Sequence, residues 1–453
     1  MRVHFIAIGG SAMHNLAIAL HLKGFKVTGS DDEIFEPSRS RLAKHGLLPH
    51  KMGWQVDTIS SDLDAIILGM HARPDNPELL RAQEMDLKIY SYPEYLYEQT
   101  KDKKRVVIGG SHGKTTTTAM VMHVLKALKM DFDYMVGAQL EGFDTMVKLT
   151  KKAPIAVFEG DEYLSSPIDL TPKFHWYRPH VAMLTGVAWD HMNVFPTWEN
   201  YVSQFEIFAD KMEPGGALIW FAQDEVLAAI AKTKSEQLRV QAYESFPHEN
   251  RNGQCIINFE GTEYPMQVFG DHNLQNMKGA LLVCQQLGIE ADVFLKAMMS
   301  FKGAAKRLQL LAKNEHTNIY LDFAHSPSKL KATTEAVKKQ FSNRKLVAVM
   351  ELHTFSSLNK DFLPQYAHTM DAADQAYVYF NPDVIAHKKL PPVSHDEVHQ
   401  AFDRSDLQVF TSPDELVMLL KQQNLTDANL LIMTSGNLSG VNLGELATEL
   451  INN

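Results

Sequence analysis

The chain has few cysteines, no long apolar run and no excess of positive charge, and each absence excludes a class of protein. Only Cys255 and Cys284 occur among 453 residues, which predicts buried free thiols in a reducing compartment and no disulfide framework. No stretch approaches the roughly 20 apolar residues that a membrane-spanning helix requires. The formal charge of -10 at pH 7 disfavours a nucleic-acid partner, because phosphate contacts need clustered lysine and arginine.

The amino-terminal apolar segment is too short for the core of a signal peptide. It covers residues 3–8 and is interrupted by the glycines at positions 9 and 10. This pattern predicts a first strand that enters a glycine-rich turn. We therefore expect a cytoplasmic protein that has no membrane partner.

The bulk composition predicts folded α/β domains throughout. Hydrophobic residues make up 45% and charged residues 22% of the chain, which is typical of globular proteins. A chain of this length is too long for a single hydrophobic core of ordinary size, so two to four domains are expected. Strand-like runs alternate with helical patterns, which predicts parallel α/β units. The main predicted strands are residues 3–8, 26–28, 65–68, 88–90, 105–108, 155–158, 181–185, 217–221, 318–322, 346–350, 376–380 and 430–433.

The strands fall into three series. The first closes at a polar linker, residues 98–104, and the second ends with predicted helices near 273–287 and 291–299. The predicted domains are residues 1–99, 100–303 and 304–453. The expected fold class is α/β with three domains: a Rossmann-like amino-terminal domain, a central P-loop ATPase-like domain and a Rossmann-like carboxyl-terminal domain.

A glycine-rich loop follows the predicted strand 105–108 and leads into a helical run over 117–128. It consists of Gly110, Ser111, His112, Gly113, Lys114, Thr115 and Thr116. Glycines let backbone N–H groups turn toward phosphate oxygens, and the helix N-terminus adds its positive end. We expect Lys114 to reach the terminal phosphates of ATP and Thr115 to offer a hydroxyl to Mg²⁺. The order of strand, loop and helix makes a chance glycine turn a poor alternative, although the loop is shorter than the usual P-loop.

Acidic residues follow the next predicted strand. Glu159 is the best candidate for a magnesium ligand, with Asp161 and Glu162 close behind it. One strand later, His191 is placed to bind a second metal ion through a neutral imidazole. Ligands gather at the carboxyl ends of parallel strands, so the predicted metal ligands beside the phosphate loop are Thr115, Glu159 and His191.

Six motifs, in order and spanning nearly the whole chain, resemble those of the Mur ligase family. Residues 110–116 resemble its G-T-H-G-K-T-T loop, 159–162 its E-A-D-E motif, 190–191 its D-H, 270–276 its G-x-H-N-x-x-N, 305–308 its R-R/K-R turn and 322–327 its D-Y-A-H-x-P. The resemblance implies an ATP-dependent ligase that makes an amide bond through an acyl phosphate. Positive charge must neutralise the moving phosphoryl group, and Lys114 with Mg²⁺ would supply it.

The resemblance also assigns roles outside the phosphate loop. It implies that His272 and Asn273 lie near the adenine and that Arg307 contacts phosphate. It further implies that Asp322 and His325 lie at a domain interface over ATP. The predicted catalytic residues are Lys114, Glu159, His191 and Arg307.

The first glycine loop implies a UDP-linked sugar acid as substrate. Residues 9–13 resemble the sugar-nucleotide loop of family members that act on UDP-N-acetylmuramate, although alanine stands at positions 7 and 12 where glycine is usual. Asp31 is spaced to hold a ribose hydroxyl, and the residues after the strand 65–68 are candidate sugar-nucleotide contacts. The candidate substrate-binding residues are Gly9, Gly10, Ser11, Ala12, Met13, Asp31, His71 and Arg73.

The amine acceptor has two candidates. Three stretches, residues 162–163, 322–325 and 433–440, favour the family branch that attaches recovered L-Ala-γ-D-Glu-meso-diaminopimelate in peptidoglycan recycling. We expect that tripeptide, with L-alanine in peptidoglycan biosynthesis as the alternative. Outside this class, the first loop and Asp31 would also suit a nicotinamide-dependent oxidoreductase, and a nucleotide-sensing switch is a further alternative.

Overall fold

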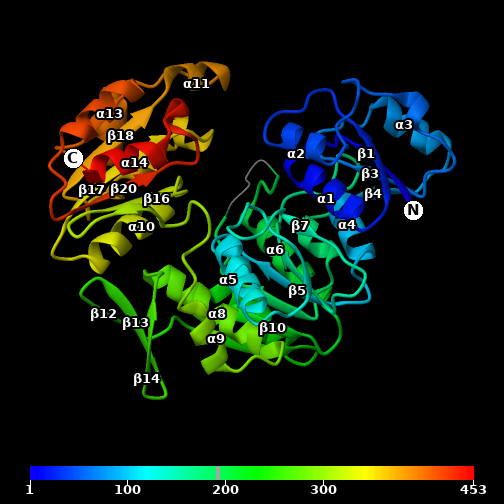
Figure 1. The fold of residues 1–453 in the computed structure, drawn as a ribbon, viewed down its shortest axis with the longest axis horizontal. Coiled ribbons are helices and arrows are strands. Elements are labelled where there is room, and N and C mark those ends of the chain that lie inside the picture. Colours follow the sequence, from blue (N-terminus) through cyan, green and yellow to red (C-terminus); the bar gives the residue numbers. More distant parts are fainter. Residues whose placement is uncertain (190–193, 453) are drawn as a thin grey trace. The chain divides into compact units, whose positions relative to one another are not determined.

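The computed structural model describes residues 1–189 and 194–452 (Figure 1). The chain divides into two compact units. Unit 1 comprises Met1–Ser245 with Gln275–Met298, and unit 2 comprises Phe246–Leu274 with Met299–Asn453. Within the described residues, every helix is too short or too polar to cross a lipid bilayer.

Unit 1 opens with a four-stranded parallel sheet in the order β2-β1-β3-β4. Its strands are β1 (Arg2–Ile6), β2 (Lys26–Ser30), β3 (Ala65–Leu68) and β4 (Ile89–Ser91), and its helices are α1 (Ser11–Leu22), α2 (Ser38–Lys44), α3 (Pro77–Glu84) and α4 (Tyr92–Glu98). The chain passes from β1 to its neighbour β2 on one side, and later returns to β3 on the other side of β1. The loop after β1 therefore opens at the point where ligands bind in sheets of this kind.

A second sheet of unit 1 has seven strands in the order β11-β10-β9-β5-β8-β6-β7, all parallel except β7. Its strands are β5 (Lys104–Gly109), β6 (Phe132–Met135), β7 (Val147–Lys148), β8 (Ile155–Glu159), β9 (Val181–Leu184), β10 (Ala217–Phe221) and β11 (Arg239–Tyr243). Its helices are α5 (Lys114–Ala127), α6 (Trp198–Asp210), α7 (Glu225–Lys234), α9 (Ala291–Met298) and the later part of α8 (Asp271–Gln286). Because β5 lies between β8 and β9, the loops that follow these three strands meet at one edge.

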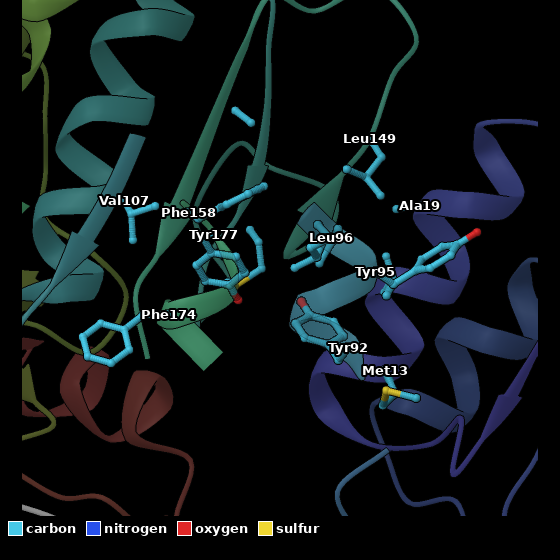
Figure 2. Close-up of a cluster of buried hydrophobic side chains, with 14 of the residues drawn as sticks. Met13, Ala19, Tyr92, Tyr95, Leu96, Val107, Leu149, Phe158, Phe174 and Tyr177 are labelled. Carbon is cyan, nitrogen blue, oxygen red and sulfur yellow. The ribbon is translucent and has the colours of Figure 1, made fainter. Parts of the chain in front are cut away.

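One continuous apolar cluster serves both sheets of unit 1 (Figure 2). Helix α4 contributes Tyr92, Tyr95 and Leu96, all buried. The strand β8 adds Phe158, whose ring centroid is 4.9 Å from that of Tyr177. Burial of large aromatic side chains is a main source of stability, so this shared core joins the two sheets.

The predicted polar linker at residues 98–104 is partly buried. Lys103 is almost inaccessible and pairs with Asp133 at 2.6 Å. The adjacent Arg105 is 1% exposed, donates to the carbonyl of Tyr177 at 2.8 Å, and pairs with Glu213 at 2.6 Å. A buried charge is tolerated only when it is paired and hydrogen-bonded, so these contacts anchor the segment.

Unit 2 contains a six-stranded sheet in the order β15-β16-β20-β17-β18-β19, parallel except for β15. Its strands are β15 (Gln309–Lys313), β16 (Asn318–Asp322), β17 (Lys345–Leu352), β18 (Gln375–Phe380), β19 (Gln408–Phe410) and β20 (Ala428–Met433). Its helices are α10 (Pro327–Gln340), α11 (Pro382–His387), α12 (His395–Phe402), α13 (Pro413–Gln422) and α14 (Leu443–Asn452). A small antiparallel sheet of β12 (Glu249–Arg251), β13 (Gln254–Phe259) and β14 (Thr262–Met266) also belongs to this unit.

All twelve predicted strands are present, so the α/β prediction is confirmed. The first strand ends earlier than predicted, because Ala7 adopts a positive φ of 67°. The antiparallel sheet β12–β14 was not predicted. Its three strands have 3, 6 and 5 residues, so the alternation of β13 and β14 is too brief to stand out in the sequence.

Candidate active site

The loop after β5 has the backbone of a phosphate cradle. Gly110 and Gly113 adopt φ values of 120° and 81°, which L side chains rarely adopt. A Cβ atom at Gly110 would collide with Thr185, and one at Gly113 would collide with the side-chain amide of Asn276. Glycine is therefore required at both positions by conformation and by space. Helix α5 begins directly after Gly113, three residues earlier than the predicted run 117–128, so its N-terminus lies at the loop.

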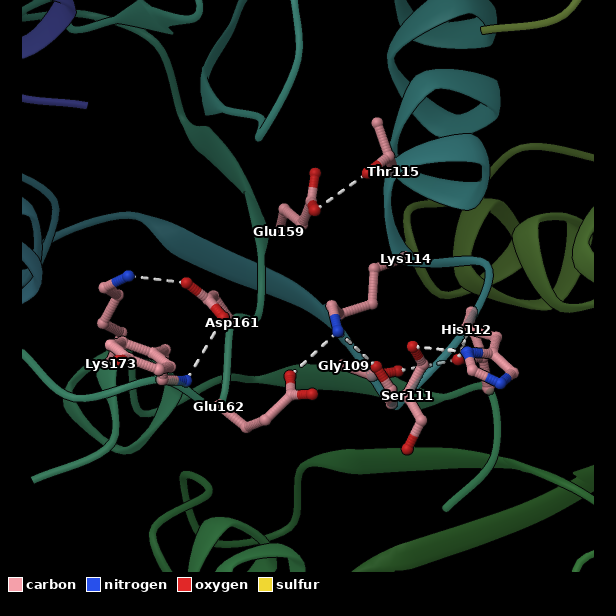
Figure 3. A network of polar contacts seen from close by, with 12 residues as sticks. Gly109, Ser111, His112, Lys114, Thr115, Glu159, Asp161, Glu162 and Lys173 are labelled. Atoms are coloured by element: carbon pink, nitrogen blue, oxygen red, sulfur yellow. Dashed lines mark hydrogen bonds and ion pairs between the residues drawn. The ribbon is translucent and has the colours of Figure 1, made fainter. Parts of the chain in front are cut away.

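Lys114 lies at the centre of the cradle (Figure 3). Its Nζ donates to the carbonyl of Gly110 at 2.6 Å and pairs with Glu162 Oε2 at 2.9 Å. Burial disfavours the ammonium, but the carboxylates of Glu162, Asp161 and Glu159 outweigh that effect and raise the pKa of Lys114. The lysine is thus held as a cation beside the phosphate loop, which is the charge state that phosphoryl transfer requires.

Glu159 and Thr115, two of the three predicted metal ligands, are brought together. Thr115 Oγ1 donates to Glu159 Oε1 at 2.9 Å, and the Gly137 amide donates to Oε2 at 2.7 Å. Burial raises the pKa of Glu159, against the opposing effects of Gly137, Lys114 and Thr115. A carboxylate and a hydroxyl are the oxygen donors that Mg²⁺ prefers, so these residues fit the predicted ion. The third predicted ligand, His191, lies outside the described residues.

Asp161 and Glu162, the other acidic candidates, each hold a lysine. Asp161 Oδ2 pairs with Lys173 Nζ at 2.6 Å. Burial tends to raise the pKa of Asp161, but Lys173 and Lys114 reverse the effect and lower it. Glu162 is fully buried and also accepts from the Tyr201 hydroxyl at 3.1 Å.

The remaining loop residues have bonds inside the protein. The Ser111 amide donates to the carbonyl of Gly186 at 2.9 Å, and its Oγ lies 2.9 Å from the Tyr201 hydroxyl. His112 Nδ1 lies 2.8 Å from the carbonyl of Ser111. Thr116 is buried in the first turn of α5. Ser111 and Thr116 therefore stabilise the phosphate loop from inside the protein.

Sequence reasoning missed Lys173, Tyr201 and Gly137. They lie 14, 42 and 22 residues from Glu159 along the chain. Each reaches the site through the strand order, because β9 and β6 flank β5 and β8. Acidic residues at the end of a strand indicate a nearby cation. This pattern after β8 was the only sequence feature that pointed to Lys173.

The predicted sugar-nucleotide loop forms a compact turn at the carboxyl edge of the first sheet. The Gly9 amide donates to Asp31 Oδ2 at 2.6 Å. Burial raises the pKa of Asp31 to about 6, although the Gly9 amide opposes the shift. A Cβ atom at Gly10 would lie 3.7 Å from the His71 ring. The structure thus brings Gly9, Gly10, Asp31 and His71 together.

The other candidates around this loop differ in burial. Ser11, Ala12 and Met13 form the first turn of α1, and only Met13 is fully buried. Arg73 is exposed on the loop before α3. Asn76, in the same loop, caps α3 by accepting from the amides of Glu78 and Leu79. The loop before α3 is therefore a turn that ends in a helix cap and carries exposed side chains.

The predicted site residues of unit 2 gather around Asp322 at the end of β16. Asp322 accepts from the amides of Leu308 and Ala324, both at 2.7 Å. Burial raises its pKa, and the Leu308 amide and Arg307 oppose the shift. The Arg307 guanidinium lies 4.6 Å above the Phe323 ring. Asp322 thus shapes the turn that presents Arg307.

The other three candidates of unit 2 are also placed by the backbone. His325 Nδ1 lies 2.9 Å from the carbonyl of Phe323. Asn273, in the first turn of α8, donates to the carbonyl of Phe269 at 2.9 Å. Burial lowers the pKa of His272, with Asp322 and Asp271 opposing the shift. His272 is therefore favoured as a neutral imidazole.

Three family models match consecutive parts of the chain. They are the Mur ligase family catalytic domain at residues 2–104, the Mur ligase middle domain at 108–284 and the Mur ligase glutamate ligase domain at 306–437. Together with the phosphate cradle and its carboxylates, they define the class: the chain belongs to the Mur ligase family. Members of this family are ATP-dependent enzymes that form amide bonds in peptidoglycan precursors.

Two relatives indicate the neighbourhood within the family. The chain is 30% identical to a UDP-N-acetylmuramate–L-alanine ligase of Mycobacterium marinum over 416 residues, which cover 86% of this chain and 82% of the relative. It is 29% identical to the enzyme of the same name from Caldicellulosiruptor bescii over 392 residues, covering 83% and 82%.

Solved structures share the three-domain fold. The UDP-N-acetylmuramate-alanine ligase of Thermotoga maritima matches with a TM-score of 0.73 at 21% identity, covering 100% of this chain and 98% of the other. A murein peptide ligase from Psychrobacter arcticus matches with a TM-score of 0.64 at 21% identity, covering 100% and 99%. At this identity the likeness establishes the architecture and leaves the acceptor open.

Proposed function

We propose that this Mur ligase activates the carboxylate of UDP-N-acetylmuramate with ATP and joins it to an amine acceptor. The observation that carries the proposal is the partly buried Lys114, held between the loop carbonyl of Gly110 and the carboxylate of Glu162 at the N-terminus of α5. A cation in such a cradle favours a triphosphate and the charge that develops as its terminal group moves.

The neighbouring residues suit the same reaction. Mg²⁺ held by Thr115 and Glu159 would neutralise phosphate oxygens during transfer. Glu162 pairs with Lys114, and the Tyr201 hydroxyl donates in turn to Glu162, which orients the lysine. Asp161 is occupied by Lys173, so Glu159 is the carboxylate that we assign to the metal ion.

The sugar nucleotide is assigned to the loop after β1. The turn of Gly9 and Gly10 lies between Asp31 and His71, with Arg73 exposed nearby. We expect Asp31 to accept a ribose hydroxyl, because a carboxylate beside a glycine turn suits a hydroxyl better than a phosphate. We then expect the pyrophosphate of the UDP group to bind at the N-terminus of α1.

L-Alanine is the better supported acceptor. Both relatives described above are named UDP-N-acetylmuramate–L-alanine ligase. Their names favour L-alanine over the tripeptide that the sequence motifs suggest. The tripeptide L-Ala-γ-D-Glu-meso-diaminopimelate is retained as a second candidate on one observation: the loop after β20 runs Thr434-Ser435-Gly436-Asn437-Leu438-Ser439-Gly440, which resembles the corresponding loop of ligases that accept the peptide.

One experiment tests the reaction and the choice of acceptor. Purified protein is given ATP, Mg²⁺, UDP-N-acetylmuramate and either L-alanine or the tripeptide, and phosphate release and amide product are measured. Product with L-alanine alone supports the first candidate, and product with the tripeptide alone supports the second. Failure of both, with no phosphate release, would overturn the assignment of a ligase.

A further inference from the structure

A buried carboxylate lies against the first sheet of unit 1, close to the turn that we assign to the sugar nucleotide. It belongs to Glu78, in the first turn of α3, and the side chain is fully buried. Asn76 caps this helix and accepts from the Glu78 amide at 2.9 Å. A buried charge is costly unless it is paired and hydrogen-bonded, so the partners of this carboxylate indicate what it contributes.

Two partners of Glu78 come from adjacent strands. The parallel register pairs His4 of β1 with Thr28 of β2, and side chains alternate along a strand, so His4 and Ser30 lie on one face of the sheet. Glu78 Oε2 accepts from the Ser30 hydroxyl and lies 3.4 Å from His4 Nε2. Burial tends to raise the pKa of Glu78, but the bonds from His4 and Ser30 outweigh this effect and lower it. The group is therefore held as a carboxylate that joins β1, β2 and α3.

A third partner comes from the loop between β2 and β3. Glu78 Oε1 accepts from the backbone amide of Gln55. Two residues earlier in the same loop, the Gly53 amide donates to the carbonyl of Asp31 at 2.7 Å, which forms a short antiparallel bridge between the two segments. Through separate oxygens, the carboxylate thus anchors the end of β2 that precedes Asp31 and the loop that pairs with Asp31.

The end of β2 also holds the glycine turn. The carbonyl of Ser30 accepts from two consecutive amides of that turn, those of Ala7 and Ile8, each at 3.0 Å. The next residue, Asp31, accepts from the Gly9 amide through Oδ2 at 2.6 Å. Because Ser30 donates its hydroxyl to the buried carboxylate, a displacement of that carboxylate would move the turn and Asp31 together.

We propose that Glu78 is a positioning residue for the sugar nucleotide, which fixes the Asp31 carboxylate and the glycine turn without touching the ligand itself. The inference rests on the proposed function, which assigns the UDP group to this turn. A binding group must be held within about 0.5 Å of its working position by the contacts behind it. Apolar side chains often stabilise a fold as well as a buried ionic group does, so the main contribution of this network is fixed geometry.

Binding of UDP-N-acetylmuramate in the absence of ATP measures this positioning directly. Glu78→Gln keeps the size of the side chain but removes its charge and turns one acceptor oxygen into a donor. We expect its Kd for UDP-N-acetylmuramate, from calorimetry, to rise about 10-fold, while its Kd for a non-hydrolysable ATP analogue keeps the wild-type value. With both substrates saturating, kcat should stay near the wild-type value, because the contacts of Lys114 are unchanged.

Ser30→Ala tests the contact through which Glu78 reaches the turn. This substitution removes only the hydroxyl, and we expect about a 3-fold rise in the same Kd. The double variant should bind no more weakly than Glu78→Gln alone, because both substitutions break one shared contact. Effects that simply add would contradict the role assigned to that contact. If Glu78→Gln does not fold, Ser30→Ala carries the test, and a wild-type Kd in that variant would overturn the inference.

Asp133 of β6 provides the matched control. It is also a fully buried carboxylate of unit 1, paired with Lys103 at 2.6 Å. Asp133→Asn should lower the melting temperature and keep the wild-type Kd for UDP-N-acetylmuramate. If folded Glu78→Gln behaves in the same way, or if its Kd for the ATP analogue rises equally, the inference is overturned and the ligase assignment stands. If the wild-type protein binds the ATP analogue but no UDP-N-acetylmuramate, the proposed substrate and the inference are both overturned.

Discussion

Two glycine turns in unit 1 look alike in sequence but have different chemistry. Both follow a parallel strand and open a helix: residues 7–10 lie between β1 and α1, and residues 110–113 lie between β5 and α5. In the first, the positive φ falls on Ala7, and the Gly9 amide is bonded to the carboxylate of Asp31. In the second, Gly110 and Gly113 have the positive φ angles, and the Lys114 ammonium donates to the carbonyl of Gly110.

The difference shows that charge, more than backbone shape, decides which ligand a glycine turn accepts. Both turns place a helix N-terminus at a sheet edge, which is favourable for any anion. We expect the Asp31 carboxylate beside the first turn to accept a hydroxyl, with the pyrophosphate at the N-terminus of α1. We expect the lysine beside the second turn to neutralise a triphosphate. Four experiments test this contrast.

Removal of the lysine should have the largest effect. For Lys114→Ala we expect kcat to fall on the order of 10⁴-fold, measured as ATP-dependent phosphate release. The substitution also removes the cation that pairs with the buried carboxylate of Glu162, which costs about 3–5 kcal/mol of stability. The double variant Lys114→Ala with Glu162→Gln should recover the stability and none of the activity. Recovered turnover in the double variant would contradict the assigned role.

Neutralising the proposed metal ligand should have the next largest effect. Glu159→Gln keeps one oxygen to accept from the Gly137 amide and an NH₂ group that can donate to the Thr115 hydroxyl, but it loses the charge. We therefore expect about a 100-fold lower kcat and a higher Mg²⁺ requirement. Asp161→Asn is the comparison, because that carboxylate is occupied by Lys173. Titrating activity against Mg²⁺ checks the prediction, and equal Mg²⁺ requirements in the two variants would refute it.

Asp31 should make the first turn sensitive to pH. Burial raises its pKa from 3.8 to about 6, so the folded state holds this proton more tightly than the unfolded chain does. The resulting stabilisation is complete below about pH 3.8 and is lost as the pH rises through about 6. At about 1.4 kcal/mol per pKa unit it amounts to at most about 3 kcal/mol.

Asp31→Asn isolates that effect. The difference in unfolding free energy between the wild-type protein and this variant, from urea melts at pH 4.5 and pH 7, should shift against the wild-type protein at the higher pH. Other titrating groups are common to both proteins and cancel. A difference that does not change with pH would mean that Asp31 titrates normally.

Alanine in the two turns should have the smallest and most selective effects. Gly113→Ala forces a side chain into a positive φ against Asn276 and should cost about 2 kcal/mol while weakening ATP binding. Gly9→Ala places a Cβ atom 2.8 Å from Ile34 Cγ1 and should cost about 1 kcal/mol while raising the KM for the UDP substrate alone. The KM values for the two substrates measure the contrast, and the same change in both variants would remove it.

Much of the site could be read from local sequence because its parts follow predictable strand ends. Gly110, Gly113 and Lys114 lie in one short motif, and Glu159 directly follows an apolar strand. The cations and donors that complete the site could not be read in this way. Lys173 and Tyr201 are distant in the chain and carry no motif of their own, so only the packing of neighbouring strands brings them to Asp161 and Glu162.

The fold shows the same division. Apolar runs predicted the buried parallel strands, because strands covered on both faces need continuous hydrophobic sequence. The sheet β12–β14 was missed because its strands are short and β12 is exposed throughout. The polar composition of residues 98–104 did not reveal that Lys103 has the buried partner Asp133.

By itself, the sequence determined the α/β class, the positions of the two glycine turns and the family. These depend on short-range patterns: apolar periodicity, glycine where φ must be positive, and charged residues at strand ends. Only the tertiary structure decided which carboxylate meets which cation. Pairing across strands depends on sheet order and register, and the energy of a buried charge depends on neighbours that are distant in the chain.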